Sequence, residues 1–267
     1  MHKFSMFLSV LVLVAGLGTA TASTITLDLS HPTQTVSGEA FLAVPGPGKY
    51  EFAASATFTL TPGSSSNTFT LVLANTSPQA VTAPAQMLSA IFWNSPTTLT
   101  PVAAALTSGS GWVNPPNVAL NVGGNYSYHG ALRQTGVDPA PTNQGVSAVG
   151  IGLFAIGNFG ATSTKVAGDA YDILPPGGIA GKTTSFKGKY PLANNSMTFT
   201  FHTDADAITI GDVIFHYSSA YTGVNVSAIL PSASGQGNPV PLPPTALLLG
   251  SGLLGLGLLG FRRRRKA

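Results

Sequence analysis

The chain has 267 residues, no cysteine, 8% charged residues and 44% apolar residues. The lack of cysteine excludes disulfides, thiol catalysis and cysteine-bound metals, and the apolar content is too high for a disordered chain. Half of the twelve Lys and Arg residues lie near the two ends; between residues 23 and 238, six basic and nine acidic residues give a net charge of −3. A domain of this size can build its own core. Its net negative charge argues against nucleic-acid binding.

Residues 1–22 have the features of a secretory signal peptide. A short polar start precedes an apolar run over residues 4–18, and Ala20 and Ala22 supply the small side chains that cleavage requires. We therefore expect export through the general secretory translocon and removal of the leader by signal peptidase after Ala22. The mature, extracytoplasmic chain would begin at Ser23.

The body of the chain, residues 23–230, alternates between apolar and polar residues with a period of two, which is typical of strands with one buried face. Strands are expected over residues 24–29, 56–60, 69–73, 88–93, 99–106, 147–156, 197–201 and 208–217. Turns rich in Gly and Pro separate them. We predict an all-β domain, an antiparallel β-sandwich of the jelly-roll-like type. Residues 231–238 follow as a flexible linker.

The C-terminal segment, residues 239–267, has three parts in a fixed order. A proline-rich motif over 239–244 comes first, 17 uncharged residues over 245–261 follow, and a basic tail over 262–267 closes the chain. A helix of that length spans about 25 Å, slightly less than the roughly 30 Å hydrocarbon core, and long basic side chains can reach the interface. We expect a single transmembrane helix in the inner membrane, with the cations kept in the cytoplasm. These cations are Arg262, Arg263, Arg264, Arg265 and Lys266.

This order of proline motif, Leu- and Gly-rich helix and arginine cluster resembles the PEP-CTERM sorting signal of Gram-negative bacteria. The resemblance implies that an exosortase, a membrane-embedded transpeptidase, processes the chain at the proline motif. The motif residues are Pro241, Leu242, Pro243 and Pro244. Leu242 stands where the family has glutamate, which implies a variant processing enzyme. Residues 242–246, LPPTA, are also similar to the LPxTG sortase signal, but the glycine-dotted helix fits the exosortase class better.

The body of the chain carries a second resemblance. The stretches VLANTSPQAVTAPAQMLSAIFWN, GLFAIGNFG and MTFTFHTDADAITIGDVIFHYSSAY resemble a group of exosortase-dependent surface proteins over most of residues 50–222. The group has no assigned activity. The resemblance therefore implies a surface protein and no particular chemistry.

The best polar constellation consists of His202, Asp204 and Asp206. At a spacing of two these side chains would share one face if the strand continued, and together they could bind a hard cation. A solvated strand end is the favoured interpretation, because acidic residues are mostly exposed. We therefore predict no metal site and no cofactor.

Two other functions stay open as alternatives. A secreted carbohydrate-binding module could use exposed aromatic side chains, although packing in the core is the favoured role for them. The candidates are Trp93, Trp112, Tyr126 and Tyr128. An extracellular hydrolase would need a catalytic base or acid. Its candidates are His129, His202, Asp204 and Asp206.

The leading hypothesis is a non-enzymatic protein of the cell surface or extracellular matrix. Its precursor would be held in the inner membrane by the helix over residues 245–261 and then processed by an exosortase-like transpeptidase. The product would be attached to a surface carrier or released, with extracellular polysaccharide as a further partner.

Overall fold

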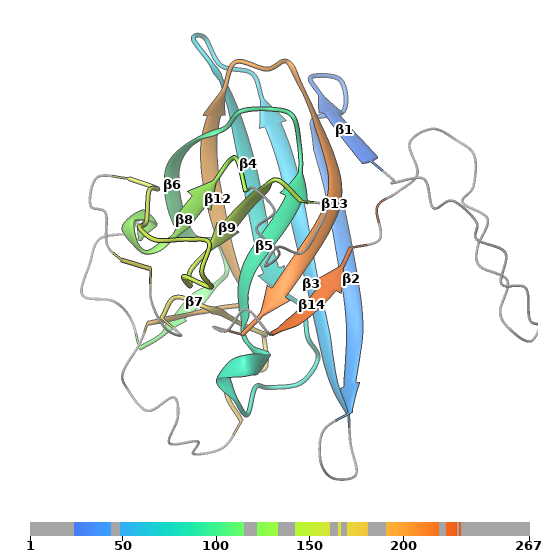
Figure 1. The fold of residues 1–267 in the computed structure, drawn as a ribbon, viewed down its shortest axis with the longest axis vertical. Coiled ribbons are helices and arrows are strands. Elements are labelled where there is room, and N and C mark those ends of the chain that lie inside the picture. Colours follow the sequence, from blue (N-terminus) through green and yellow to red (C-terminus); the bar gives the residue numbers. More distant parts are fainter. Residues whose placement is uncertain are drawn as a thin grey trace, which may run out of the picture.

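The computed structural model describes residues 24–43, 49–114, 122–132, 142–160, 165–166, 170–180, 191–218, 223–228 and 230. Within these ranges the chain forms fourteen β-strands and two short 3₁₀ helices, and it contains no α-helix (Figure 1). The prediction of an all-β domain is therefore confirmed. The leader, the linker and the C-terminal helix predicted from the sequence lie outside the described ranges. No helix in the described part is long and apolar enough to cross a membrane.

The first sheet has five strands, all antiparallel, in the order β2-β3-β4-β12-β6. The strands are β2 (Thr33–Ala43), β3 (Lys49–Thr61), β4 (Asn67–Asn75), β12 (Ser196–Thr203) and β6 (Thr100–Leu106). Burial alternates along β4, because Phe69, Leu71 and Leu73 point inward and their neighbours point outward. This sheet confirms the period of two seen in the sequence.

The second sheet has nine strands, six of which follow the order β1-β13-β5-β10-β11-β7. They are β1 (Thr24–Asp28), β13 (Ala207–Tyr217), β5 (Leu88–Asn94), β10 (Ile173–Leu174), β11 (Leu192–Asn194) and β7 (Gly111–Val113). The other three are β14 (Val224–Ser227) on β13, β9 (Gln144–Ser147) on β5, and β8 (Ser127–His129) on β9. The short pair β10 and β11 is parallel, whereas the other strand pairs of this sheet are antiparallel.

The two sheets face each other across one apolar core. Aromatic rings from the two sheets meet there: the ring centroids of Phe58 and Trp93 lie 6.3 Å apart, and those of Phe52 and Tyr217 lie 4.9 Å apart. Ring pairs of this kind add to the free energy gained from burial alone. The domain is therefore held together by burial between two layers, as a protein without disulfides requires. The jelly-roll-like connectivity stays a prediction.

The predicted strand over residues 147–156 is wrong beyond Ser147. The chain turns instead, with positive φ angles at Ile151 (37°) and Gly152 (79°) and a hydrogen bond from the Phe154 nitrogen to the Gly150 oxygen at 2.8 Å. Its apolar side chains form a second cluster against the outer side of β5 and β13. An apolar run that folds back over a sheet is buried just as a strand would be, so periodicity does not tell the two apart.

Both ends of the domain meet on one edge of β13. β5 occupies one side of β13, while β1 pairs with residues 207–211 and β14 with residues 214–217 on the other side (Figure 1). Thr24 lies opposite Gly211, and the Ala228 nitrogen donates a hydrogen bond to the Val213 oxygen at 2.7 Å. The chain therefore enters and leaves the domain at neighbouring points.

Candidate functional site

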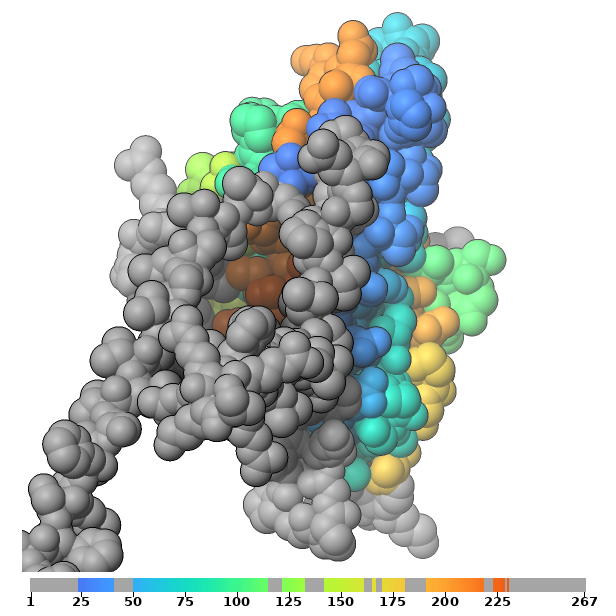
Figure 2. Space-filling model, turned by 90° about the vertical axis from the view of Figure 1, so that its right-hand side faces the viewer, coloured from blue at the N-terminus to red at the C-terminus, as the bar shows by residue number. Residues whose placement is uncertain are grey.

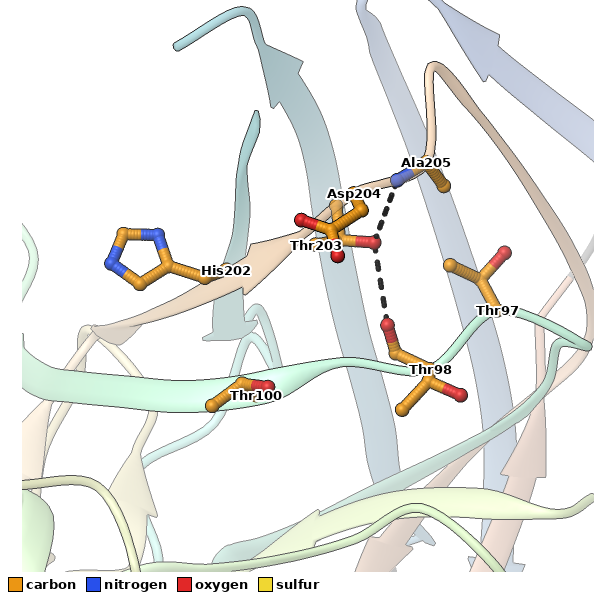
Figure 3. A pocket seen from close by; sticks show the side chains of 7 residues that line it. All are labelled: Thr97, Thr98, Thr100, His202, Thr203, Asp204 and Ala205. Carbon is orange, nitrogen blue, oxygen red and sulfur yellow. Dashed lines mark hydrogen bonds between the residues drawn. The ribbon is translucent and has the colours of Figure 1, made fainter. Parts of the chain in front are cut away.

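A polar hollow of about 370 Å³ opens where β12 ends and β6 begins (Figure 3). The residues that line it are Thr97, Thr98, Thr100, His202, Thr203, Asp204 and Ala205. It lies near the end of the molecule at which the β12–β13 turn, orange in Figure 2, adjoins the β3–β4 turn. This hollow contains two of the three residues of the predicted polar constellation.

Thr203 fixes the shape of the hollow. Its hydroxyl donates to the Thr98 oxygen at 3.3 Å and accepts a hydrogen bond from the Ala205 nitrogen at 3.2 Å. His202 and Asp204 are exposed on either side of this buried residue. In Figure 3 the His202 ring points away from the Asp204 carboxylate. The two side chains thus do not act as a pair.

The shared face that a longer strand would give His202, Asp204 and Asp206 does not form, because β12 ends at Thr203 and the two acids lie in the turn that follows. Asp206 instead accepts a hydrogen bond from the Asn67 side-chain nitrogen at 3.0 Å. In the described part of the chain, no three His, Cys, Asp or Glu side chains are grouped so that they could hold a metal ion. The turn after β12, which is the interpretation favoured from the sequence, separates these residues.

Asn67 joins the two turns at this end of the molecule. Its amide nitrogen donates to the Ala205 oxygen and to Asp206, both at 3.0 Å, and its oxygen accepts from the Gly63 nitrogen at 3.2 Å. Replacing Asn67 with alanine is expected to lower the free energy of unfolding by about 1–2 kcal/mol, because these hydrogen bonds are lost near the buried end of β4. Urea unfolding at neutral pH measures this change.

A second replacement, Asn67→Asp, separates the hydrogen bonds from the electrostatics. The new carboxylate would face Asp206, so the loss of stability should be larger at neutral pH than below about pH 4, where carboxyl groups become protonated. Equal stability of the wild type and Asn67→Ala would contradict the bridging role of Asn67.

Three of the four aromatic residues proposed for a sugar-binding face belong to the core. Trp93, Tyr126 and Tyr128 are buried, and burial raises the pKa of Tyr128 to about 12. Only Trp112, on β7, is partly exposed, where its ring meets that of Tyr171 edge-on at 5.9 Å. Packing in the core, the role favoured from the sequence, is therefore confirmed for Trp93, Tyr126 and Tyr128, and the described residues do not display the alternative aromatic platform.

The candidate catalytic groups make contacts of a structural kind. His129 accepts a hydrogen bond from the Ala131 nitrogen at 3.2 Å. Ser147, a buried serine outside these candidates, has a hydroxyl that donates to the Val149 oxygen at 2.7 Å and accepts from the Val149 nitrogen at 3.0 Å. These contacts stabilise local turns, and they do not join the His129 and Ser147 side chains to each other.

Sequence reasoning overlooked the outward side of the five-stranded sheet. Four adjacent strands carry the pattern Thr-x-Thr at residues 33–35, 57–59, 68–70 and 198–200. Every Thr in these patterns is exposed or half-buried on the outer side. We call this surface the threonine face. The repeated tripeptide was the available signal, although only the pairing register could show which of these threonines lie opposite one another.

The other predicted functional residues lie outside the described part of the chain. They comprise the cleavage residues Ala20, Ala22 and Ser23, the motif residues 241–244 and the basic residues 262–266. No protein-family model matches the sequence, and neither the curated proteins nor the solved structures contain a significant match.

Proposed function

We propose that this protein is an exported, non-enzymatic component of the cell surface or extracellular matrix. The observation that carries the proposal is the order of the proline motif over 239–244, the uncharged run over 245–261 and the five cations that follow. A buried helix in a soluble core would not need such a cluster of cations, whereas a membrane anchor with a cytoplasmic end does.

The arrangement of the domain supports a tethered precursor. Strand β1 begins at Thr24, and Leu230 is buried against the core near the other end of the domain. The chain enters and leaves the domain beside the same stretch of β13. In the precursor, the N-terminal leader and the C-terminal anchor would therefore be connected to the domain at neighbouring points. We further propose that the domain is a sandwich of the jelly-roll-like type.

The proposed processing is a transpeptidation at the proline motif. The enzyme would cut a peptide bond near Pro241, Leu242, Pro243 and Pro244, and pass the new carboxyl end of the domain to a nucleophile on a surface carrier or to water. The helix and the basic tail would stay in the inner membrane. In this proposal the chain is the substrate, and its partners are the translocon, signal peptidase and an exosortase-like transpeptidase.

The C-terminus of the mature protein tests this proposal. We expect intact-mass and peptide mass spectrometry of the protein from its own host to find an end between residues 241 and 245, with or without an added mass. An intact basic tail in the membrane fraction would show instead a permanently anchored domain, and Leu242 would be the first residue to replace with glutamate.

A further inference from the structure

The threonine face consists of hydroxyl rows that run across the strands. In one row, Thr33 lies opposite Thr59, Thr59 opposite Thr70, and Thr70 opposite Thr200. The next row is formed by Thr35, Thr57, Val72 and Thr198. At the β6 edge the two rows end at Ala103 and Ala105. Seven of the eight positions on the first four strands are therefore threonine.

The side chains in these rows can form hydrogen bonds but carry no charge. Neither row contains an ionisable side chain. The Thr33 and Thr59 hydroxyls lie 3.2 Å apart and those of Thr35 and Thr57 lie 2.8 Å apart, so each pair is already oriented across the strands. A threonine hydroxyl both donates and accepts, and its methyl group adds a small apolar contact. A partner that matches this surface is neutral, rich in hydroxyl groups and partly apolar.

The spacing of the rows favours a long, repeating partner. Neighbouring strands lie about 4.8 Å apart, and residues two apart on one strand are separated by about 6.8 Å. The first distance is close to the length of one sugar unit in an extended β-linked glycan. A glycan chain that lies across the strands would therefore meet about one threonine per sugar unit. The second row offers a parallel set of threonine side chains.

The twist of the sheet further restricts the class of partner that can fit the threonine face. Neighbouring strands are rotated by roughly 20–25° relative to each other, so a row over four strands follows a curved path. A flexible polysaccharide chain can follow this path, whereas a rigid lattice such as ice or a crystalline fibre loses register. At one end of the face, His202 and Thr100 lie opposite each other and also line the polar hollow. The hollow thus adjoins the threonine face.

We infer that the threonine face binds an extended, neutral, β-linked polysaccharide that lies across strands β2, β3, β4 and β12. This inference goes beyond the proposed function and does not depend on it, because the face belongs to the folded domain whatever happens at the C-terminus. The threonine face thus takes the place of the aromatic residues, three of which are buried, as the candidate surface for polysaccharide binding.

Affinity electrophoresis of the full chain in mild detergent, in native gels that contain hydroxyethyl cellulose, tests the inference. We expect the wild type to be retarded. The double replacement Thr59→Val and Thr70→Val should weaken binding about tenfold, because two hydroxyls are lost while side-chain shape and strand propensity are kept. The double replacement with serine keeps both hydroxyls and should retain most of the retardation.

The matched control is Thr26→Val with Thr209→Val, a facing threonine pair on β1 and β13 in the other sheet. It should bind like the wild type, and all variants should unfold at similar temperatures. The inference would be overturned by no retardation of the wild type, by equal retardation of the Thr59/Thr70 valine variant, or by retention by the charged polymer alginate alone. Adsorption to growing ice crystals that is lost in the valine variant would likewise overturn it, in favour of a water lattice as the ligand.

Discussion

Replacing Phe201 with alanine is expected to lower the free energy of unfolding by about 3–5 kcal/mol. Its side chain is fully buried, and its ring lies 5.7 Å from that of Phe69, 5.2 Å from that of Tyr128 and 5.1 Å from that of Phe159. These partners come from both layers, so the cavity would open between the sheets. Because a domain of this kind is stable by only about 5–15 kcal/mol, this single change removes a large part of the total.

Urea unfolding followed by tryptophan fluorescence measures the loss, since Trp93 lies in the same core. The matched control is Thr200→Ala, the preceding residue of β12, which faces outward. Its effect should stay within about 1 kcal/mol, the range of strand propensities. Similar losses for both variants would mean that β12 does not present alternate residues to the core and to the outside.

Neutralising the basic tail is expected to abolish the proposed processing at the proline motif. Five adjacent cations are costly to move across a membrane, so in the proposed topology they hold the end of the chain in the cytoplasm. With glutamine in place of Arg262–Arg265 and Lys266, the 17-residue run loses this stop and should no longer present the motif at a fixed depth. We expect mass spectrometry to find an unprocessed C-terminus, or a chain that is released whole.

A charge-conserving control accompanies this experiment. Replacing the four arginines with lysine keeps all five charges, so processing should continue at the wild-type position. If the glutamine variant were processed at the same residue and in the same yield as the wild type, the basic tail would have no role in sorting. The proline motif alone would then be sufficient for the enzyme.

Sequence patterns predicted strands that are apolar on one face and missed those that depend on a partner. Phe69, Leu71 and Leu73 alternate with polar residues, and β4 forms where expected. β2 has the sequence TQTVSGEAFLA, whose first eight residues hold only one large apolar residue, Val36, so periodicity gave no signal. It is a strand because it pairs with β3 along its whole length. Pairing of this kind depends on residues distant in the chain.

The candidate site shows the same limit. The spacing of His202, Asp204 and Asp206 would give one face only if the strand continued, and the position at which β12 ends depends on the turn that Thr203 and Asn67 stabilise. Likewise, Trp93 lies in the apolar run of β5, which is buried on both sides, so its exposure could not be judged from its type. The threonine rows depend on the register of four strands, and register is a property of the folded sheet.

The position of β1 has a consequence for the order of folding. Residues 24–28 are the first of the domain to be synthesised, yet they pair with residues 207–211, which come almost last. Such a contact closes a very long loop and forms slowly. In a chain exported from its N-terminus, as we propose, the nine-stranded sheet cannot be completed until residues 207–211 have crossed the membrane. The topology itself would therefore delay the closure of the domain during translocation.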